Sequence, residues 1–291
     1  MNLYEETKFL MKKYNLSANK NLGQNFLIDE EVINKIVDAS ETTKEDLVIE
    51  IGPGLGSLTK KLLEKAGKVI SVELDQRMVE ILKDRFFMYN NFEIIYEDIL
   101  KVDLEQLIEE NKKQNKLKNV KIVANLPYYI TTPIIMKLLE DKLEIESITV
   151  MIQKEVAERL CDIPGGKKTG AITYSVYYYA EAKQILTVPN NSFIPEPEVT
   201  SEVIKLKIRK EPIIKVNNEK MLFKIIKIAF MQRRKTLVNA IASSDLFSSK
   251  EEIIECLNKL NIPINIRGEK LTIEQYADIT NYIINTSSNV M

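Results

Sequence analysis

Histidine and tryptophan are absent from this sequence of 291 residues, and cysteine occurs only twice. Without an imidazole side chain, the protein cannot build a Ser-His-Asp site, a Cys-His site or a histidine-ligated metal site. Cys161 and Cys256 are far apart and show no CxxC spacing, which argues against a zinc site or a disulfide framework. We therefore expect no bound metal and two reduced, structural cysteines.

Long apolar runs and an excess of either charge are also missing. No uninterrupted apolar stretch could span a bilayer, and residues 1–20 lack the apolar core and small-residue cleavage site of a secretory signal. The spaced apolar residues of that segment predict a short amphipathic helix instead. A content of 45% hydrophobic and 29% charged residues, with a net charge of -1, is typical of soluble globular proteins. We therefore expect a cytoplasmic location and no membrane contact.

The spacing of apolar residues changes along the chain and predicts two domains. From about Thr43, short apolar runs alternate with helical patterns, as in a parallel α/β sheet. The β-rich segments 172–180 and 202–209 have no long helix between them, so we expect the sheet to close with an antiparallel pair. The last part of the chain has helical spacing throughout. We therefore predict an α/β fold, with a Rossmann-like, mixed sheet of about seven strands in residues 1–210 and a small helical domain in residues 211–291.

A glycine-rich turn, GPGLG at residues 52–56, follows a buried strand and precedes a helix that begins near Ser57. Doubly wound sheets bind nucleotides at such turns, where glycine lets the backbone approach a ligand. NAD-dependent dehydrogenases use a similar turn, but here Pro53 removes an N–H that a pyrophosphate would bind, and no phosphate ligand replaces it. S-adenosylmethionine has no phosphate, so the turn favours it as cofactor, with Gly52 and Gly54 as contacts. A plain surface connection is the alternative for the turn taken by itself.

Two acids follow the next strands at the same edge of the sheet. Glu73 ends the second strand, where a carboxylate can accept hydrogen bonds from ribose hydroxyls. Asp75 is better placed to cap the following helix. Asp98, after the third strand, can accept a hydrogen bond from an adenine amino group. The two acids therefore predict a pocket for the adenosine part of the cofactor.

The tetrapeptide Asn125-Leu126-Pro127-Tyr128 follows the fourth strand. An adenine N6 lone pair is delocalised into the ring, so methylation at N6 needs hydrogen-bond acceptors that make the nitrogen more tetrahedral. The Asn125 side-chain oxygen and the Leu126 carbonyl are two such acceptors, and Pro127 holds the chain so that both point one way. Tyr128 can stack on a base that has left its helix. The alternative is that the tetrapeptide is only a strand end followed by a proline turn. Tyr129 is explained equally well as a packing residue.

Seven separated segments together resemble one family, the small-subunit ribosomal RNA adenine dimethyltransferases. They are LGQNFLID (22–29), EIGPGLGSLT (50–59), VELD (72–75), NLPYYITTP (125–133), QKEVAERL (153–160), FIPEPEVTS (193–201) and AFMQRRKTLVNAI (229–241). The match spans nearly the whole chain, and AFMQRRKT is specific to this family rather than to methyltransferases in general.

The resemblance implies a class I methyltransferase that uses S-adenosylmethionine. It would convert two adjacent adenosines in the 3′-terminal stem-loop of small-subunit ribosomal RNA to N6,N6-dimethyladenosine during subunit maturation. The cofactor contacts that it implies are Asn25, Leu27, Gly52, Glu73, Asp98 and Asn125. From its residues alone, the loop at 19–29 is only a polar connection before a helix that Asp29 caps. We expect a monomer whose partner is the small ribosomal subunit.

Basic residues without nearby acids mark a candidate RNA surface between residues 220 and 244. If one continuous helix covers this segment, one face carries Lys220, Lys224, Lys227, Arg234 and Lys235, which can neutralise phosphates. A solvated helix face explains the lysines equally well. Arg233 projects toward the apolar side, so we expect it to have a carboxylate partner or to bind an RNA phosphate. The turn at 165–168 (GGKK) is a further, weaker candidate.

Other interpretations differ in the features that they need. A dehydrogenase is disfavoured by Pro53 and by the NLPY tetrapeptide. Large-subunit ribosomal RNA methyltransferases typically have isoleucine at the position of Leu126 and lack AFMQRRKT. A non-catalytic ribosome-assembly protein with the same fold stays open, although the intact Glu73, Asp98 and Asn125 disfavour it.

Overall fold

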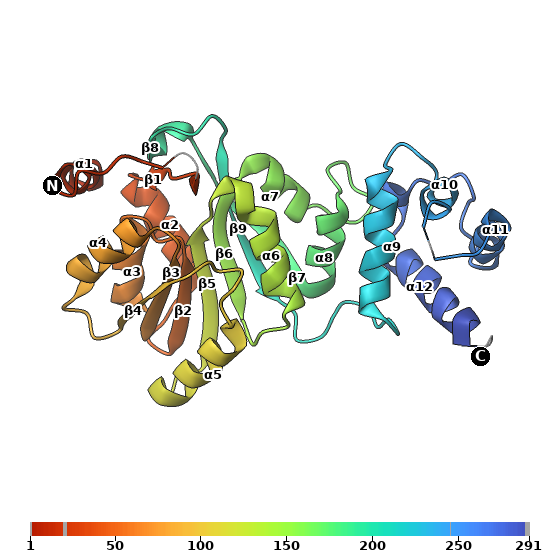
Figure 1. The fold of residues 1–291 in the computed structure, drawn as a ribbon, viewed down its shortest axis with the longest axis horizontal. Coiled ribbons are helices and arrows are strands. Elements are labelled where there is room, and N and C mark those ends of the chain that lie inside the picture. Colours follow the sequence, from red (N-terminus) through yellow and green to blue (C-terminus); the bar gives the residue numbers. More distant parts are fainter. Residues whose placement is uncertain (1, 20–21, 245, 289–291) are drawn as a thin grey trace. The chain divides into compact units, whose positions relative to one another are not determined.

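The computed structural model describes residues 2–19, 22–244 and 246–288, and it divides the chain into two compact units (Figure 1). The first unit contains Met1–Ala157 and Glu181–Ile208, and the second contains Glu158–Ala180 and Arg209–Met291. We predicted one boundary near residue 210, with each domain continuous in sequence. In the structure, each compact unit combines two separate stretches of the chain. Lys20 and Asn21 of the loop at 19–29 lie outside the described residues.

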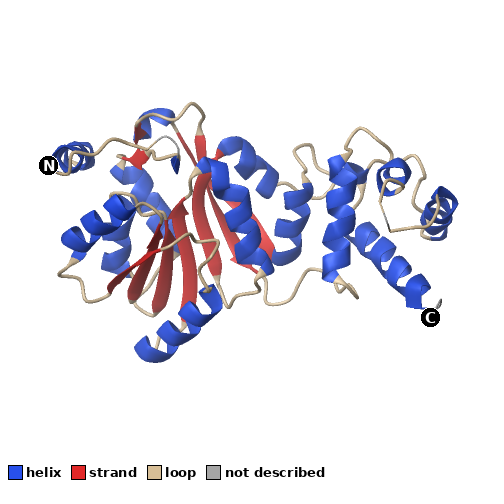
Figure 2. Cartoon of the chain, in the orientation of Figure 1, coloured by secondary structure: helices blue, strands red, loops and turns tan. Residues whose placement is uncertain are grey.

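A mixed sheet of seven strands forms the centre of the first unit, as predicted (Figure 2). Its order is β4-β3-β2-β5-β6-β9-β7. The strands are β2 (Asp46–Ile51), β3 (Lys68–Glu73), β4 (Phe92–Tyr96), β5 (Asn119–Asn125), β6 (Ser147–Gln153), β7 (Ala180–Val188) and β9 (Ser201–Ile208). Strands β2 to β6 pair in parallel, and β9 pairs antiparallel with β6. The predicted mixed sheet of about seven strands is therefore confirmed, and the antiparallel strand β9 lies between β6 and the edge strand β7.

Four helices connect the parallel strands: α3 (Ser57–Lys65), α4 (Gln76–Phe86), α5 (Leu104–Asn115) and α6 (Thr131–Glu140). Helix α2 (Glu30–Ser40) precedes β2, and α7 (Lys154–Leu160) follows β6. The predicted N-terminal helix is α1 (Leu3–Lys13). As predicted, Asp29 caps α2 and Asp75 caps α4, because each carboxylate accepts a backbone N–H of the first helical turn.

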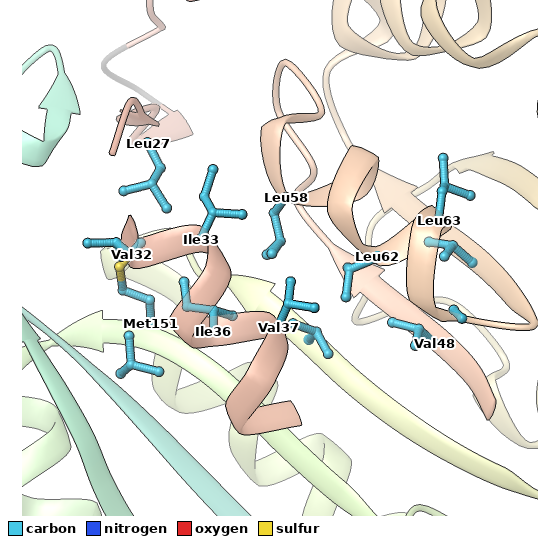
Figure 3. Packing of buried hydrophobic residues seen from close by; sticks show 14 of the residues in the cluster. Leu27, Val32, Ile33, Ile36, Val37, Val48, Leu58, Leu62, Leu63 and Met151 are labelled. Atoms are coloured by element: carbon cyan, nitrogen blue, oxygen red, sulfur yellow. The ribbon is translucent and has the colours of Figure 1, made fainter. Parts of the chain in front are cut away.

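Apolar side chains from α2, α3 and the sheet form the main core of the first unit (Figure 3). Ile33, Ile36 and Val37 of α2 face Leu58 and Leu62 of α3, and all five are nearly or fully buried. Burial of each such side chain contributes roughly 1.5–3 kcal/mol. The helix that follows the glycine turn is therefore fixed against the sheet by its apolar face.

The β-rich segment at 172–180 was predicted as a strand, and this prediction is wrong for all but its last residue. Residues Ala171–Tyr179 form helix α8, and strand β7 begins at Ala180. Tyr174 and Tyr178 lie four residues apart, so a helix places both rings in the apolar core of the second unit. The Tyr174 hydroxyl also donates to the Leu271 carbonyl at 2.7 Å. Tertiary packing thus overrides the strand preference of tyrosine and valine.

The second unit is helical, as the apolar spacing predicted. Besides α8 it contains α9 (Glu219–Met231), α10 (Leu237–Ile241), α11 (Lys250–Lys259) and α12 (Ile273–Ser288). The continuous helix assumed for residues 220–244 is wrong, because the chain leaves helical geometry at Gln232 (φ -126°, ψ 50°). Thr236 then caps α10 by accepting the Asn239 N–H, and the Leu237 N–H donates to Ile266 outside the helix.

The parallel strands β2, β3, β4 and β5 end at one edge of the sheet. Ligands of open α/β sheets bind outside this edge. The glycine turn, Glu73, Asp98 and the NLPY tetrapeptide all follow these strand ends, so the fold brings them together. Among the described residues, no helix is long and apolar enough to cross a membrane.

Candidate functional site

One pocket at this edge contains all ten residues predicted for the cofactor and the target base. It is lined by Asn25, Leu27, Gly52, Gly54, Glu73, Asp98, Asn125, Leu126, Pro127 and Tyr128, with neighbours from the same segments. Asn25 and Leu27 reach it because β1 (Phe26–Leu27) pairs antiparallel with β8 (Phe193–Ile194). This small second sheet joins two of the seven resembling segments, 22–29 and 193–201.

The glycine turn has a backbone shape that other residues rarely adopt. Gly52, Gly54 and Gly56 have φ values of 66°, 56° and 83°. A Cβ on Gly56 would lie 2.6 Å from Leu82 Cδ2 and 2.7 Å from Phe86 Cε2, so α4 packs where a side chain would be. Because these conformations suit glycine, the backbone at Gly52 and Gly54 can lie directly against the pocket, beside Pro53 and Leu55.

Glu73 is the best-held acid of the pocket. Its Oε1 accepts the N–H groups of Leu74 and Asp75, each at 2.8 Å, and its Oε2 accepts the Gly54 N–H at 3.3 Å. The carboxyl is almost completely buried, and this burial raises its pKa above the usual value. The glycine turn and the second strand are thus tied together through a carboxylate that lines the pocket.

Asp75 is engaged elsewhere, in agreement with its predicted role as a helix cap. It pairs with the Arg77 guanidinium at 2.6 Å and accepts the Gln24 amide at 2.9 Å. The Arg77 bonds lower the pKa of this carboxyl. The Gln24 bond also holds the N-terminal loop to the start of α4, a link that we did not expect from the sequence. Of the two acids, only Glu73 lines the pocket, and its role as a ribose acceptor stays a prediction.

Asp98 is half-exposed and lines the pocket. Its Oδ1 accepts the Leu100 N–H at 3.0 Å, which orients the carboxylate. Its other oxygen has no hydrogen-bond partner among the residues that the structure describes. Leu74 and Ile99 supply apolar surface beside it. An oriented acceptor beside apolar surface suits the edge of a purine ring.

The Asn125 side chain has a defined orientation. Its Nδ2 donates to the backbone carbonyl of Asn25 at 3.3 Å, so its Oδ1 is the atom left to accept a hydrogen bond. The Leu126 N–H donates to the Met151 carbonyl at 3.1 Å, which fixes the next peptide. A Cβ on Gly52 would lie 3.9 Å from the Asn125 carbonyl oxygen, so the glycine turn passes beside the tetrapeptide.

The two tyrosines after Pro127 differ in their surroundings. The Tyr128 phenol is half-buried and shares a hydrogen bond of 2.6 Å with Ser201 Oγ. Burial raises its pKa, so the phenol stays neutral. Tyr129 is 56% exposed, and a Cβ on Gly23 would lie 3.4 Å from its ring. Tyr128 is therefore anchored by its polar end, whereas Tyr129 lies against the N-terminal loop.

Glu50 is a pocket residue to which we assigned no role from the sequence. It is fully buried at the end of β2, and its Oε2 accepts the hydroxyls of Thr59 at 2.7 Å and Ser71 at 2.8 Å. Its Oε1 has no partner among the described residues. Burial raises its pKa to about 7. An acid inside the apolar run LVIEIG was the signal that could have identified it.

The basic residues predicted for RNA are all exposed, but the helix break separates them into two groups. Lys220, Lys224 and Lys227 lie on α9, whereas Arg234 and Lys235 follow it in the turn before α10. The prediction that all five basic residues lie on one helix face is therefore wrong. The three α9 lysines recur at intervals of four and three residues, so they share one helix face.

We expected Arg233 to have a carboxylate partner or to bind an RNA phosphate, and in the structure it pairs with a carboxylate. Its Nη2 lies 3.0 Å from Glu269 Oε2 and 3.3 Å from the Thr169 carbonyl oxygen. The guanidinium also lies 5.8 Å from the centre of the Phe230 ring. In the turn at 165–168, Lys168 pairs with Glu158 at 3.0 Å. Both cations are therefore already engaged within the second unit.

Metal ligands are not gathered anywhere in the described residues, where no group of three acids or cysteines could hold an ion. Cys256 is buried in the second unit and Cys161 is partly buried, and neither forms a disulfide. Burial raises the pKa of the Cys256 thiol to about 12. This thiol is therefore inert, as a structural cysteine should be.

Comparisons with known proteins agree on one family. A profile described as ribosomal RNA adenine dimethylase matches residues 15–285. A ribosomal RNA small subunit methyltransferase A from Alkaliphilus oremlandii is 47% identical over 277 residues, which are 95% of this chain and 96% of that protein. One of the same name from Bacillus pumilus is 47% identical over 279 residues, covering 95% of each chain.

Two solved structures resemble the fold. A dimethyladenosine transferase from Plasmodium falciparum superposes with a TM-score of 0.76 and 26% identity, over 90% of this chain and 98% of that one. The 23S rRNA methyltransferase ErmE superposes with a TM-score of 0.67 and 22% identity, over 89% and 100% of the two chains. The similarity to ErmE, at 22% identity, supports the fold alone.

Proposed function

Because the chain belongs to the ribosomal RNA adenine dimethylase family, we propose that its pocket transfers methyl groups from S-adenosylmethionine to N6 of adenosine in small-subunit ribosomal RNA. The observation that carries this proposal is the orientation of Asn125. Its amide nitrogen is taken by the Asn25 carbonyl, which leaves Oδ1 as an acceptor in the same pocket as Glu73. An acceptor of this kind is what an adenine amino group needs.

The residues of the pocket fit S-adenosylmethionine. Glu73 Oε2 and the outer Asp98 oxygen are acceptors suited to ribose hydroxyls and to the adenine amino group, respectively. The positive-φ glycines at 52 and 54 leave room for a ligand against the backbone. Asn25 and Leu27 complete the pocket from the N-terminal loop. When bound, the cofactor supplies an electrophilic methyl group.

The tetrapeptide provides positioning rather than a base. Asn125 Oδ1 and the Leu126 carbonyl accept the N6 hydrogens and make the nitrogen lone pair available for attack. Pro127 has a φ of -59°, and its carbonyl oxygen accepts a hydrogen bond from Thr131 Oγ1 at 3.0 Å. Both features hold the turn in one shape. Tyr128 stacks on the target base. Positioning of this kind is a major source of rate enhancement, because the reacting groups no longer have to find each other.

We extend the proposal to the substrate and the surface that binds it. The target is two adjacent adenosines in the 3′-terminal stem-loop, modified during subunit maturation by a monomer in the cytoplasm. The second unit contains 16 basic and 11 acidic residues, whereas the first contains 25 and 31. Phosphate binding by Lys220, Lys224, Lys227, Arg234 and Lys235 is supported by this positive balance, with Arg233 already paired.

Labelled S-adenosylmethionine tests the proposal when it is incubated with the protein and unmethylated small subunits. Mapping should place the label on N6 of two neighbouring adenosines near the 3′ end of the RNA. Large subunits serve as the matched control and should stay unlabelled. Label in large-subunit RNA would refute the assigned substrate, and label in neither subunit would refute the activity.

A further inference from the structure

A hydrogen bond joins the target-base turn to a strand far away in the sequence. The Tyr128 phenolic oxygen and Ser201 Oγ lie 2.6 Å apart, although 73 positions separate the two residues. Ser201 is completely buried and is the first residue of β9. The polar end of the tyrosine is therefore held by a fully buried side chain.

The same strand supports both parts of the target-base site. Asn125 is in register with Met151 of β6, and Leu126 donates to the Met151 carbonyl at 3.1 Å. On its other side, β6 pairs with β9, where Gln153 is in register with Ser201. The Asn125 acceptor and the anchor of the Tyr128 ring are thus attached two residues apart on one strand.

The hydrogen bond to Ser201 matters because the Tyr128 side chain could rotate without it. A 3-10 turn at Tyr128–Ile130 holds only its backbone, and the side chain is half-exposed toward the pocket. No other hydrogen bond to its hydroxyl is present among the described residues. A ring that is already fixed loses less conformational entropy when a flipped base binds, so binding costs less free energy.

We propose that Ser201 is a positioning residue for methyl transfer: its hydroxyl fixes the Tyr128 ring at the angle from which it stacks on the target adenine beside Asn125. This inference rests on the proposed function, since it gives Tyr128 its stacking role. It adds that β9 contributes to the target-base site through the hydroxyl of its first residue and not only through packing.

Three variants test the proposal: Ser201→Ala, Tyr128→Phe and the double variant. Each removes the hydrogen bond and keeps the tyrosine or phenylalanine ring. With saturating small subunits and cofactor, each single variant should lower kcat about tenfold, as expected for one lost hydrogen bond. The double variant should be no slower than the singles, because both changes remove the same interaction. The Kd for S-adenosylmethionine and the melting temperature should change little.

A neighbouring serine provides the matched control. Ser192 is also buried in the first unit, but its hydroxyl donates to Asp29 at 3.1 Å, away from Tyr128. Ser192→Ala should leave kcat near that of the unchanged protein.

The outcomes separate the two proposals. Normal kcat in Ser201→Ala, or additive losses in the double variant, would overturn the role of Ser201 and leave the proposed function intact. A fall in kcat that only follows a lower melting temperature, shared by Ser192→Ala, would reduce Ser201 to a packing residue. If the unchanged protein methylates no subunits, the proposed function fails, and this inference fails with it.

Discussion

The two units of this protein differ in how their sequences encode function. The first unit contains more acids than bases, and its pocket is built from acceptors held by backbone N–H groups, as Glu73 is by Leu74, Asp75 and Gly54. The second unit contains more basic than acidic residues and has an apolar core of helices. A reaction site depends on fixed geometry, whereas a phosphate-binding surface depends mainly on charge.

From the proposed function we expect each unit to have its own kinetic signature. Changes in the first unit should alter kcat or cofactor affinity, and changes on the surface of the second should alter affinity for the subunit and its dependence on salt.

Asn125→Ala should reduce kcat between about a hundredfold and a thousandfold, because it removes an acceptor that acts on the reacting amino group. Affinity for S-adenosylmethionine should change little, since Glu73 and Asp98 remain. Steady-state rates with saturating small subunits, together with calorimetric titration of the cofactor, measure both quantities. If turnover is normal, the acceptor role is wrong.

Glu50→Gln should change how the stability of the first unit depends on pH. Glu50 has its folded-state pKa raised to about 7 from an ordinary value of 4.5, so the folded state binds a proton that the unfolded state has lost. The free energy of unfolding of the unchanged protein should therefore fall as pH rises from 4.5 through 7. The variant cannot ionise here, so relative to the unchanged protein it should gain up to about 3 kcal/mol between pH 4.5 and pH 8.

Urea unfolding of both proteins at pH 5 and pH 8, without cofactor, measures this difference. If the two proteins differ in unfolding free energy by the same amount at both pH values, the folded-state pKa of Glu50 is not raised, and Glu50 is ionised at both.

Replacement of the three α9 lysines, Lys220, Lys224 and Lys227, by serine should weaken binding to small subunits about tenfold or more and leave kcat unchanged. The slope of log Kd against log salt should fall by up to about three, one for each phosphate that a lysine no longer neutralises. Lys65, Lys83 and Lys113, three exposed lysines of the first unit, make a matched triple control. Equal reductions in affinity for the two triple variants would mean that α9 has no special role.

Arg233 and Glu269 should give the smallest effect. Their ion pair is partly exposed, so Glu269→Gln should lower the free energy of unfolding by at most about 1 kcal/mol. If the pair is only structural, Arg233→Gln should resemble Glu269→Gln in both stability and subunit binding. Weaker subunit binding in Arg233→Gln alone would instead indicate that the guanidinium leaves Glu269 for an RNA phosphate.

The pocket could be predicted from the sequence because of one property of parallel sheets. Their carboxyl ends meet at one edge, so Gly52, Glu73, Asp98 and Asn125 had to converge once the strands were identified. Capping by Asp29 and Asp75 was predictable for a similar reason, since it involves only neighbours along the chain. Local rules and one topological rule therefore account for most of the site.

Features that depend on long-range packing could not be predicted in this way. Tyr174 and Tyr178 belong to a segment with strand propensity that becomes helical because its rings enter a helical core. The break at Gln232 follows from packing of the next segment, where Leu237 donates to Ile266. The hydrogen bond between Tyr128 and Ser201 requires the register of β6 and β9, which apolar patterns do not specify.

The most direct test of the division between the units is a steady-state rate titration with small subunits, combined with a binding titration, because together they give kcat and the Kd for the subunit. For Asn125→Ala we predict a kcat at least about a hundredfold lower with an unchanged Kd, and for the α9 triple variant an unchanged kcat with a weaker Kd. An Asn125→Ala protein that methylates at the normal rate would contradict the account.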